Sequence, residues 1–167
     1  MRKIGFLLAV YITGFLYGGF ARAGAKEFSL WNFRVLPTAI IQESGKNSYS
    51  AFIGWNPNYA FTDKFRLGLN AAGTFLEDAN GDSFLVMEYQ ATLGFLVSES
   101  FEIEPALGGQ TWTKGGNTRP LAGLNLSYLF PDKLLGFLDR LVLGYQYYFE
   151  KSGKASQQIR LGVGLSF

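Results

Sequence analysis

The side chains of this chain that could do chemistry are carboxylates, guanidinium groups, amines and hydroxyls, because its 167 residues include no histidine and no cysteine. Without cysteine there is neither a disulfide framework nor a thiolate metal site. Without histidine there is no imidazole, the group that takes up and returns a proton near neutral pH. We therefore expect no enzymatic activity and no cofactor, and we interpret the Ser and Thr side chains as polar strand and loop residues.

A metal site is not expected either. Glu77, Asp78 and Asp82 lie close together in a polar segment, and their oxygens could loosely hold Ca²⁺. Ca²⁺ takes about six to eight oxygen ligands, however, so this incomplete set favours an ordinary solvated loop.

Six charged residues are the stronger signal, because they interrupt segments that are otherwise apolar or rich in glycine. They are Arg34, Arg66, Glu88, Glu102, Glu104 and Arg160. An unpaired charge inside a protein is costly, whereas hydrogen-bonded pairs are tolerated. We predict that the six form a paired network, with the glutamates facing Arg34 and Arg160 across a narrow interior and Arg66 nearer to Glu102 and Glu104.

The elements that must position these charges are β-strands. After residue 27 the apolar residues recur with a period of two, most clearly over 65–75, 85–97 and 159–167. The same alternation, with interruptions, predicts five further strands, near 28–36, 48–61, 101–112, 119–130 and 140–150. Each of these eight strands is about as long as the ~9–11 residues that cross a bilayer. The first strand should pair with the last, since a closed sheet leaves no backbone group unpaired in lipid.

The predicted connections alternate in character. Those at 62–64 and 98–100 are short, whereas those at 37–47, 77–82, 113–118 and 151–156 are polar and contain glycine. This alternation is typical of an outer-membrane meander with both mature termini in the periplasm. The segment 131–139 departs from this alternation because it is longer and apolar. We expect a long turn whose apolar residues lie at the membrane interface. The alternatives are a helical turn on the inner leaflet and a segment that closes the periplasmic mouth of the barrel. Pro57 and Pro105 should mark bulges or strand ends.

A membrane barrel has its apolar face outward and a soluble barrel has it inward, so the direction of the faces distinguishes the two. Charge occurs at mid-strand on the polar face, while the opposite face is nearly all aliphatic and aromatic. Glycine recurs on the polar face, where a narrow eight-stranded interior needs residues without bulk. Aromatic residues gather near the short turns, as expected where lipid tails meet headgroups. These residues are Phe61, Phe65, Phe95, Phe101, Tyr128 and Phe167.

Residues 1–23 have the pattern of a cleavable signal peptide. Arg2 and Lys3 precede an apolar stretch that ends in Ala21-Arg22-Ala23, and cleavage after Ala25 would fit as well. The alternative, an N-terminal anchor, is disfavoured by the glycines and the limited length of the stretch. Residues 24–167 then form one barrel domain. Because three basic residues lie in the leader, the mature part is nearly neutral, and we expect no nucleic-acid partner.

The end of the chain resembles the C-terminal signal of bacterial outer-membrane β-barrels, in which a polar residue, a glycine, a hydrophobic residue and a terminal aromatic recur. Here they fall on Arg160, Gly162, Leu165 and Phe167. The resemblance implies recognition by the barrel-assembly machinery. As a whole the mature chain is similar to the small eight-stranded group typified by the OmpA membrane domain, OmpX and OmpW. This second resemblance implies an all-β, antiparallel, up-and-down transmembrane barrel.

The expected role is a structural or surface-interaction one in the outer membrane, with a filled lumen. The enzymatic outer-membrane barrels depend on histidine, which this chain lacks. A small pore or a carrier of an apolar molecule is the first alternative, and a soluble periplasmic carrier of the lipocalin type is the second. Outer-membrane lipid and lipopolysaccharide are the expected partners. Basic residues in the longer loops could contact lipopolysaccharide phosphates, although nearby acids favour ordinary solvated loops. These are Lys46, Lys114, Arg119, Lys151 and Lys154.

Overall fold

The computed structural model describes residues 27–42, 48–77, 83–113, 116–149 and 156–167. Ten strand segments lie in these ranges and form one sheet. They are β1 (Glu27–Ser29), β2 (Asn32–Gln42), β3 (Ser48–Trp55), β4 (Asn58–Ala60), β5 (Phe65–Glu77), β6 (Ser83–Ser98), β7 (Phe101–Trp112), β8 (Thr118–Leu134), β9 (Leu138–Tyr148) and β10 (Ser156–Ser166). No helix in these ranges is long and apolar enough to cross a membrane. The predicted leader, residues 1–23, lies outside the described residues.

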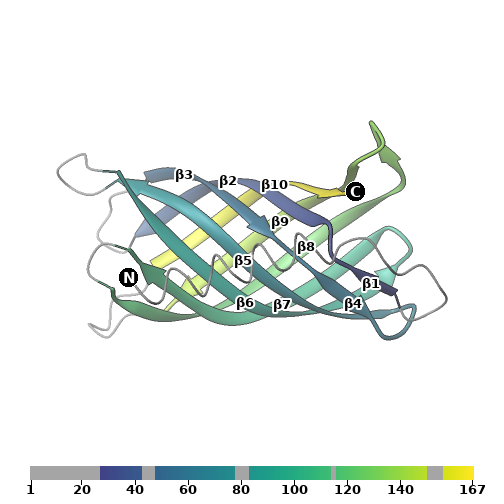
Figure 1. Cartoon of the computed structure of the whole chain (residues 1–167), viewed down its shortest axis with the longest axis horizontal. Helices are drawn as coiled ribbons and strands as arrows, with labels where there is room; N and C mark the ends of the chain where they lie inside the picture. The colour runs from purple at the N-terminus through teal and green to yellow at the C-terminus, as the bar shows by residue number, and fades with distance from the viewer. Residues whose placement is uncertain (1–26, 43–47, 78–82, 114–115, 150–155) are drawn as a thin grey trace.

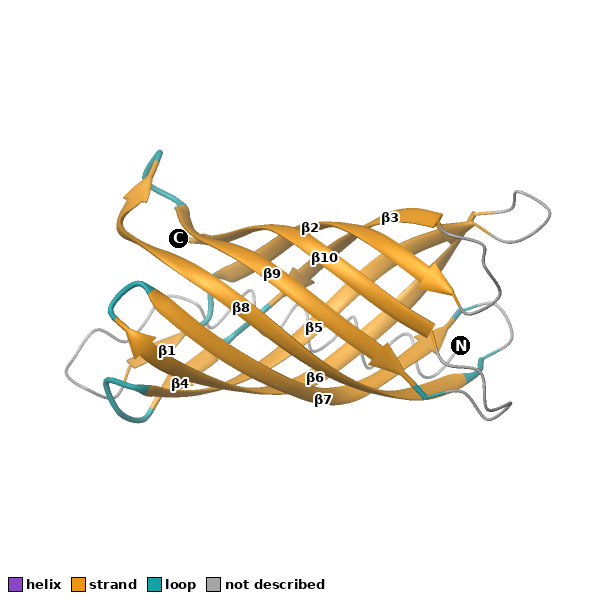
Figure 2. Ribbon diagram, turned by 180° about the vertical axis from the view of Figure 1, so that it is seen from behind, coloured by secondary structure: helices purple, strands orange, loops and turns teal. Residues whose placement is uncertain are grey.

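The ten segments make a closed barrel of eight antiparallel strands (Figures 1 and 2). Segments β1 and β2 are two halves of the first strand, and β3 and β4 are two halves of the second. Each strand pairs with the next along the chain, and β2 pairs with β10 from Asn32 opposite Ser166 to Gln42 opposite Ser156. The predicted all-β class, the strand number and the pairing of the first strand with the last are therefore confirmed.

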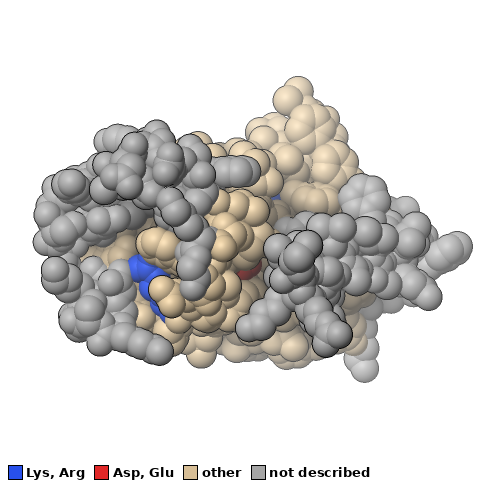
Figure 3. Space-filling model, turned by 60° about the vertical axis from the view of Figure 1, so that its left-hand side comes forward, with Lys and Arg blue, Asp and Glu red and all other residues tan. Residues whose placement is uncertain are grey.

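The side chains alternate between the two faces of this sheet in the predicted sense. Along β7 the residues are alternately exposed and buried from Phe101 to Leu107, and β9 shows the same pattern from Arg140 to Gln146. Leu67 is 56% exposed and Leu161 62% exposed, whereas Arg34, Glu88 and Arg160 are buried. The described surface seen in Figure 3 is almost entirely uncharged. The apolar face is therefore the outer one, and the interior is polar.

Hydroxyl side chains accept backbone hydrogen bonds in the short turns. The hydroxyl of Thr62 accepts hydrogen bonds from the backbone N–H groups of Lys64 (3.2 Å) and Phe65 (3.0 Å), which closes the connection between β4 and β5. Ser98 accepts from the N–H of Ser100 at 3.3 Å in the turn between β6 and β7. Such local side-chain bonds replace the ladder where the chain reverses, as is common for Ser and Thr.

Several strands are longer than the alternation predicts. Residues 37–42, expected in a loop, continue β2, and Pro37 lies opposite Ala51 of β3. The segment 131–139 is neither a long turn nor a helical one, because β8 runs to Leu134, β9 begins at Leu138, and only three residues connect them. Both differences have one cause: proline and polar residues locally favour the end of a strand, but ladder pairing with a neighbouring strand continues past them.

The two prolines inside the strands behave differently. Pro57 lies between β3 and β4 and thus at a strand end, as predicted. Pro105 lies within β7, directly opposite Leu124 of β8, with no shift of register. The prediction of a bulge or strand end there is wrong. Pairing of β7 with β6 skips Pro105 and Glu104 and resumes in the same register, so the missing N–H is tolerated without displacing the strand.

Candidate functional site

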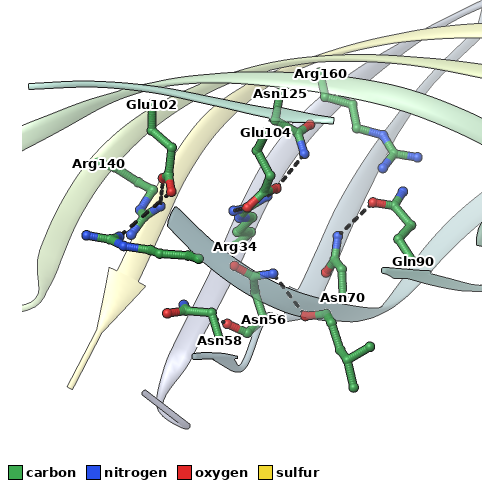
Figure 4. A network of polar contacts seen from close by, with 12 residues as sticks. Arg34, Asn56, Asn58, Asn70, Gln90, Glu102, Glu104, Asn125, Arg140 and Arg160 are labelled. Carbon is green, nitrogen blue, oxygen red and sulfur yellow. Dashed lines mark hydrogen bonds and ion pairs between the residues drawn. The ribbon is translucent and has the colours of Figure 1, made fainter. Parts of the chain in front are cut away.

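The interior of the closed barrel, called the lumen below, is the candidate site, and its first part is an ion pair between β2 and β7. Arg34 donates to Glu104 through both terminal nitrogens, at 2.7 and 2.9 Å. The side-chain amide of Asn125 on β8 donates to the same carboxylate at 2.8 Å (Figure 4). The arrangement matches the planar fork of a guanidinium to a carboxylate, which is the strongest geometry for such a pair.

A second buried pair lies between β10 and β6. Arg160 donates to both oxygens of Glu88, at 2.8 and 2.7 Å. Its Nη2 also donates to the Tyr148 hydroxyl at 2.6 Å and to the amide oxygen of Gln158 at 2.7 Å. The Tyr148 hydroxyl is 2.7 Å from Glu88, so one carboxylate, one guanidinium and one phenol share a compact buried cluster.

A third cluster joins β9 to β7 near the short turns. Arg140 donates to Glu102 at 2.7 Å and to its neighbour Asp139 at 3.0 and 3.1 Å. Arg66 of β5 is farther away, 3.9 Å from Glu102, and its side chain is 28% exposed. A Cβ added at Gly94 would collide with the Glu102 carboxylate as it is placed here, so the glycine leaves room for this cluster.

Amide side chains connect the first two pairs across the lumen. Gln90 donates to Glu88 and, at 3.3 Å, to the amide oxygen of Gln146. Gln146 donates at 3.3 Å to Asn125, which donates in turn to Glu104. This sequence of donors links β6, β9, β8 and β7 and leads from one buried carboxylate to the other.

An apolar layer lies against the Arg160 cluster. Its buried members are Leu36, Phe52, Ala72 and Val142, contributed by β2, β3, β5 and β9. The guanidinium carbon of Arg160 lies 4.3 Å from the centre of the Phe52 ring, within the range of a cation–π contact. Both charged and apolar side chains therefore line the interior, and the sequence analysis does not predict the apolar layer.

All six predicted lumen residues lie on the inner side of the strands, and Arg66 is near Glu102 as expected, but a seventh charge, Arg140, also takes part. Arg34 contacts Glu104 and Arg160 contacts Glu88, whereas the close partner of Glu102 is Arg140 rather than Arg66. Arg140 was missed because it stood at the predicted start of a strand. Counting back by twos from Gly144 would have placed it on the inner face.

The four C-terminal residues of the predicted assembly signal lie along β10 and just beyond it. Arg160 is in the cluster described above, and Gly162 approaches the backbone of Val35 and Leu36 so closely that a Cβ would collide with it. Leu165 pairs with Phe33 on one side and Leu138 on the other. Phe167 is 71% exposed on the outside of the barrel.

Most of the predicted loop contacts lie outside the described residues. This holds for Lys46, Asp78, Asp82, Lys114, Lys151 and Lys154. Glu77 ends β5, and Arg119 lies in β8 with its guanidinium carbon 4.2 Å from the centre of the Trp112 ring. In the part of the chain that the structure describes, no group of three or more acidic, histidine or cysteine side chains could hold a metal ion.

Comparison with known proteins identifies the fold. No protein-family model matches the chain, and no curated protein matches it in sequence. Among solved structures it is similar to Ail, the attachment invasion locus protein of Yersinia pestis, at 14% identity over 86% of this chain and 100% of that one, with a TM-score of 0.54. Ail in complex with the heparin analogue sucrose octasulfate matches at 16% identity, with the same coverage and TM-score. Neisserial surface protein A matches at 16% identity over 88% of this chain and 100% of that one, with a TM-score of 0.51. The chain thus has the fold of the small eight-stranded outer-membrane barrels.

Proposed function

We propose that this chain spans the bacterial outer membrane as a sealed barrel and has a non-enzymatic, structural or surface-interaction role. One observation carries the proposal: the buried guanidinium groups of the lumen are each matched by a buried carboxylate at 2.7–2.9 Å. A conducting lumen needs water and mobile charge along its length. Paired groups that satisfy one another within a narrow eight-stranded interior favour a filled one instead.

The outer surface supports a membrane location. Large apolar side chains are exposed along the middle of the strands, among them Leu69, Leu107 and Leu143. Aromatic rings cluster near the short turns, where the centre of the Phe65 ring lies 5.9 Å from that of Phe61 and 5.0 Å from that of Phe95. Such a surface suits lipid with an aromatic belt at its boundary. It also argues against the soluble carrier, whose outer face would be polar.

Planar-bilayer recording tests the sealed lumen. The purified barrel is expected to insert without stable current steps, while a porin reconstituted in the same bilayer conducts. Heat-modifiable migration of the same sample on SDS gels verifies that it was folded. Stable, reproducible steps from the folded barrel would reject the filled lumen and support the small pore.

The small pore remains the second candidate because of one residue. Arg66 is partly exposed and 3.9 Å from the Glu102 carboxylate, so one charge near the short turns is less tightly paired than the others. Recording from Arg66→Ala beside the native chain tests whether this end limits a current. An apolar carrier has less support, because the lumen is lined by charges and amides.

Fractionation tests the location and the processing together. The proposal expects the chain in detergent-extracted envelope, with an N-terminus at Gly24 or Lys26 if the leader is removed as the sequence predicts. Recovery in the soluble periplasmic pool would support the soluble carrier.

Recognition by the barrel-assembly machinery and contact with lipopolysaccharide are parts of the same proposal. The exposed ring of Phe167 is accessible to a recognition factor. Deletion of Phe167 is expected to reduce the amount of folded barrel in the envelope, and Leu161→Ala, on the same strand but outside the predicted signal, is the control.

A further inference from the structure

The hairpin that joins β8 to β9 carries exposed apolar side chains beyond the end of the barrel. All residues of its tip, 131–137, are exposed, and Leu134 and Leu135 are 49% and 84% exposed. Figures 1 and 2 show this tip, beside the C-terminus, bending away from the barrel axis and not across the mouth. In a barrel that stands upright in a bilayer, the tip therefore extends sideways, along the plane of the membrane.

A bulge accounts for this direction. Leu129 lies opposite Arg140, and the next pair is Leu134 opposite Leu138, so four residues of β8 face a single residue of β9. Extra residues in one strand bend it and increase its local twist. The bend is thus a property of the two paired strands and does not depend on a flexible loop.

The turn itself holds leucine in an unfavourable conformation. Leu135 has φ of 54° and is followed by Gly136 at 80°. Two residues with positive φ make the kind of tight turn in which Asn-Gly or Gly-Gly is preferred, and a bulky residue rarely adopts that conformation. A solvated turn would gain nothing from leucine at this position. Strain of this kind points to a requirement for the side chain itself.

The base of the hairpin is tied to the end of the chain. Lys133 donates from Nζ to the backbone carbonyl of Ser166 at 3.1 Å, and the Ser166 N–H donates to the carbonyl of Phe137 at 2.8 Å. The rings of Phe137 and Phe167 are stacked with centres 6.1 Å apart. These contacts hold the hairpin in a fixed position against β10.

A line of aromatic rings runs from the barrel wall toward the hairpin. Phe101, Tyr128 and Phe130 form a chain of ring contacts, at 5.3 and 5.6 Å, that leads along β8 toward the tip. Apolar rings of the barrel wall therefore lead up to the hairpin, whose tip carries Asp132 and Lys133 as well as its leucines. These rings, the sideways direction and the strained leucine together identify the occupant of the surface as lipid.

We infer that the β8–β9 hairpin tip is a lateral membrane anchor that inserts Leu134, Leu135 and Phe137 at the boundary between headgroups and acyl chains. The inference rests on the proposed membrane location, and it adds a contact beyond the strands that cross the bilayer. Apolar residues on a rigid element at this depth resist vertical displacement and rotation of a small barrel.

Single-cysteine labelling tests the anchor, because the chain has no cysteine of its own. Three variants carry an environment-sensitive fluorophore: Leu135→Cys at the tip, Glu99→Cys in the turn between β6 and β7, and Leu107→Cys on the outer wall. Each is reconstituted in phosphatidylethanolamine–phosphatidylglycerol vesicles with doxyl-labelled lipid. Heat-modifiable migration verifies folding, and Leu134→Cys replaces Leu135→Cys if the latter does not fold.

A shallow doxyl group is expected to quench the label at Leu135 about twofold or more above the label at Glu99, with a blue-shifted emission at Leu135. Equal quenching at Leu135 and Glu99 would overturn the anchor. The label at Leu107 separates the two proposals, because deep-doxyl quenching there shows that the barrel spans the bilayer whatever the hairpin does. A blue shift at Leu135 that disappears when the protein is diluted in lipid would indicate a second copy of the chain and would also overturn the anchor.

Discussion

At the scale of single residues, the lumen is defined by how the charges are matched. A buried ion pair is weak support for stability when compared with well-packed apolar residues, because both ions lose water. Removal of one partner is a different matter, since the other charge is then left buried and uncompensated. The bidentate contact of Arg160 with Glu88 makes this pair the most sensitive point of the lumen.

Glu88→Ala is accordingly expected to destabilise the barrel by about 3–5 kcal/mol and to lower its urea unfolding midpoint in lipid vesicles. The variant leaves the guanidinium of Arg160 with the Tyr148 hydroxyl and the Gln158 amide oxygen as acceptors, two uncharged groups. Adding Arg160→Met to Glu88→Ala removes the orphaned charge, and this double variant should recover much of the loss. A single variant as stable as the native barrel would contradict the assignment of the pair.

At the scale of elements, the second strand shows how a membrane sheet can accommodate a proline. Pro57 has no N–H to give to Leu69, although the Leu69 N–H still donates to the Pro57 carbonyl at 3.0 Å. The side-chain amide of Asn56 donates to the Leu69 carbonyl at 2.9 Å instead. The registers of β3 and β4 against β5 agree across this point, so the side chain replaces one ladder bond without displacing the strand.

Asn56→Ala should therefore cost about 1–3 kcal/mol, because it leaves the Leu69 carbonyl without a donor. In a Pro57→Ala background the backbone N–H returns, and the same Asn56→Ala change is expected to cost much less. Urea unfolding of the four chains of this double-mutant cycle measures the difference. Asn58→Ala is the control, since its amide makes only a 3.5 Å contact with Asn56. Equal losses of stability in both backgrounds would contradict the inference that the Asn56 amide replaces the backbone N–H that Pro57 lacks.

The pairing of β2 with β10 closes the sheet, and cross-linking measures it directly. Val35 lies opposite Val163. Directly opposed residues of antiparallel strands have Cα atoms about 4.5–5.5 Å apart, within the range of a disulfide. Val35→Cys with Val163→Cys is expected to oxidise readily in the folded barrel and to slow its heat-induced shift on non-reducing gels. Val35→Cys with Leu107→Cys should form no intramolecular bond, since Leu107 lies on β7. No bond in the first pair would argue against closure at this seam.

At the scale of the whole molecule, the medium around the barrel decides what an exposed charge costs. Leu107 is 69% exposed in the middle of β7, and Val97 is 67% exposed near the end of β6. On the surface of a soluble protein, arginine at either position would change stability by less than about 0.5 kcal/mol. In a bilayer the two positions differ in depth although they are equally exposed.

Leu107→Arg is thus expected to destabilise the barrel by about 2–4 kcal/mol in vesicles, and Val97→Arg by about 0–1 kcal/mol. Unfolding of both variants in the same lipid gives the comparison. Similar small costs would indicate that the outer face is not buried in hydrocarbon and would favour a soluble barrel.

The sequence by itself determined the class of fold and the direction of each face. An alternation of apolar and polar residues with a period of two is a local property of the sequence. From their neighbours alone, Leu67 and Leu161 could be assigned to the outer face. Arg34, Glu88 and Arg160 could be assigned to the inner face in the same way. The sequence could not determine where β2 ends or that Pro105 lies inside a strand, because ladder pairing with other strands decides both. Nor could it choose between Arg66 and Arg140 as the partner of Glu102, or bring Phe52 under Arg160. Those contacts cross the lumen between strands far apart in the chain, and only the stagger of the closed sheet sets which side chains meet at the same height.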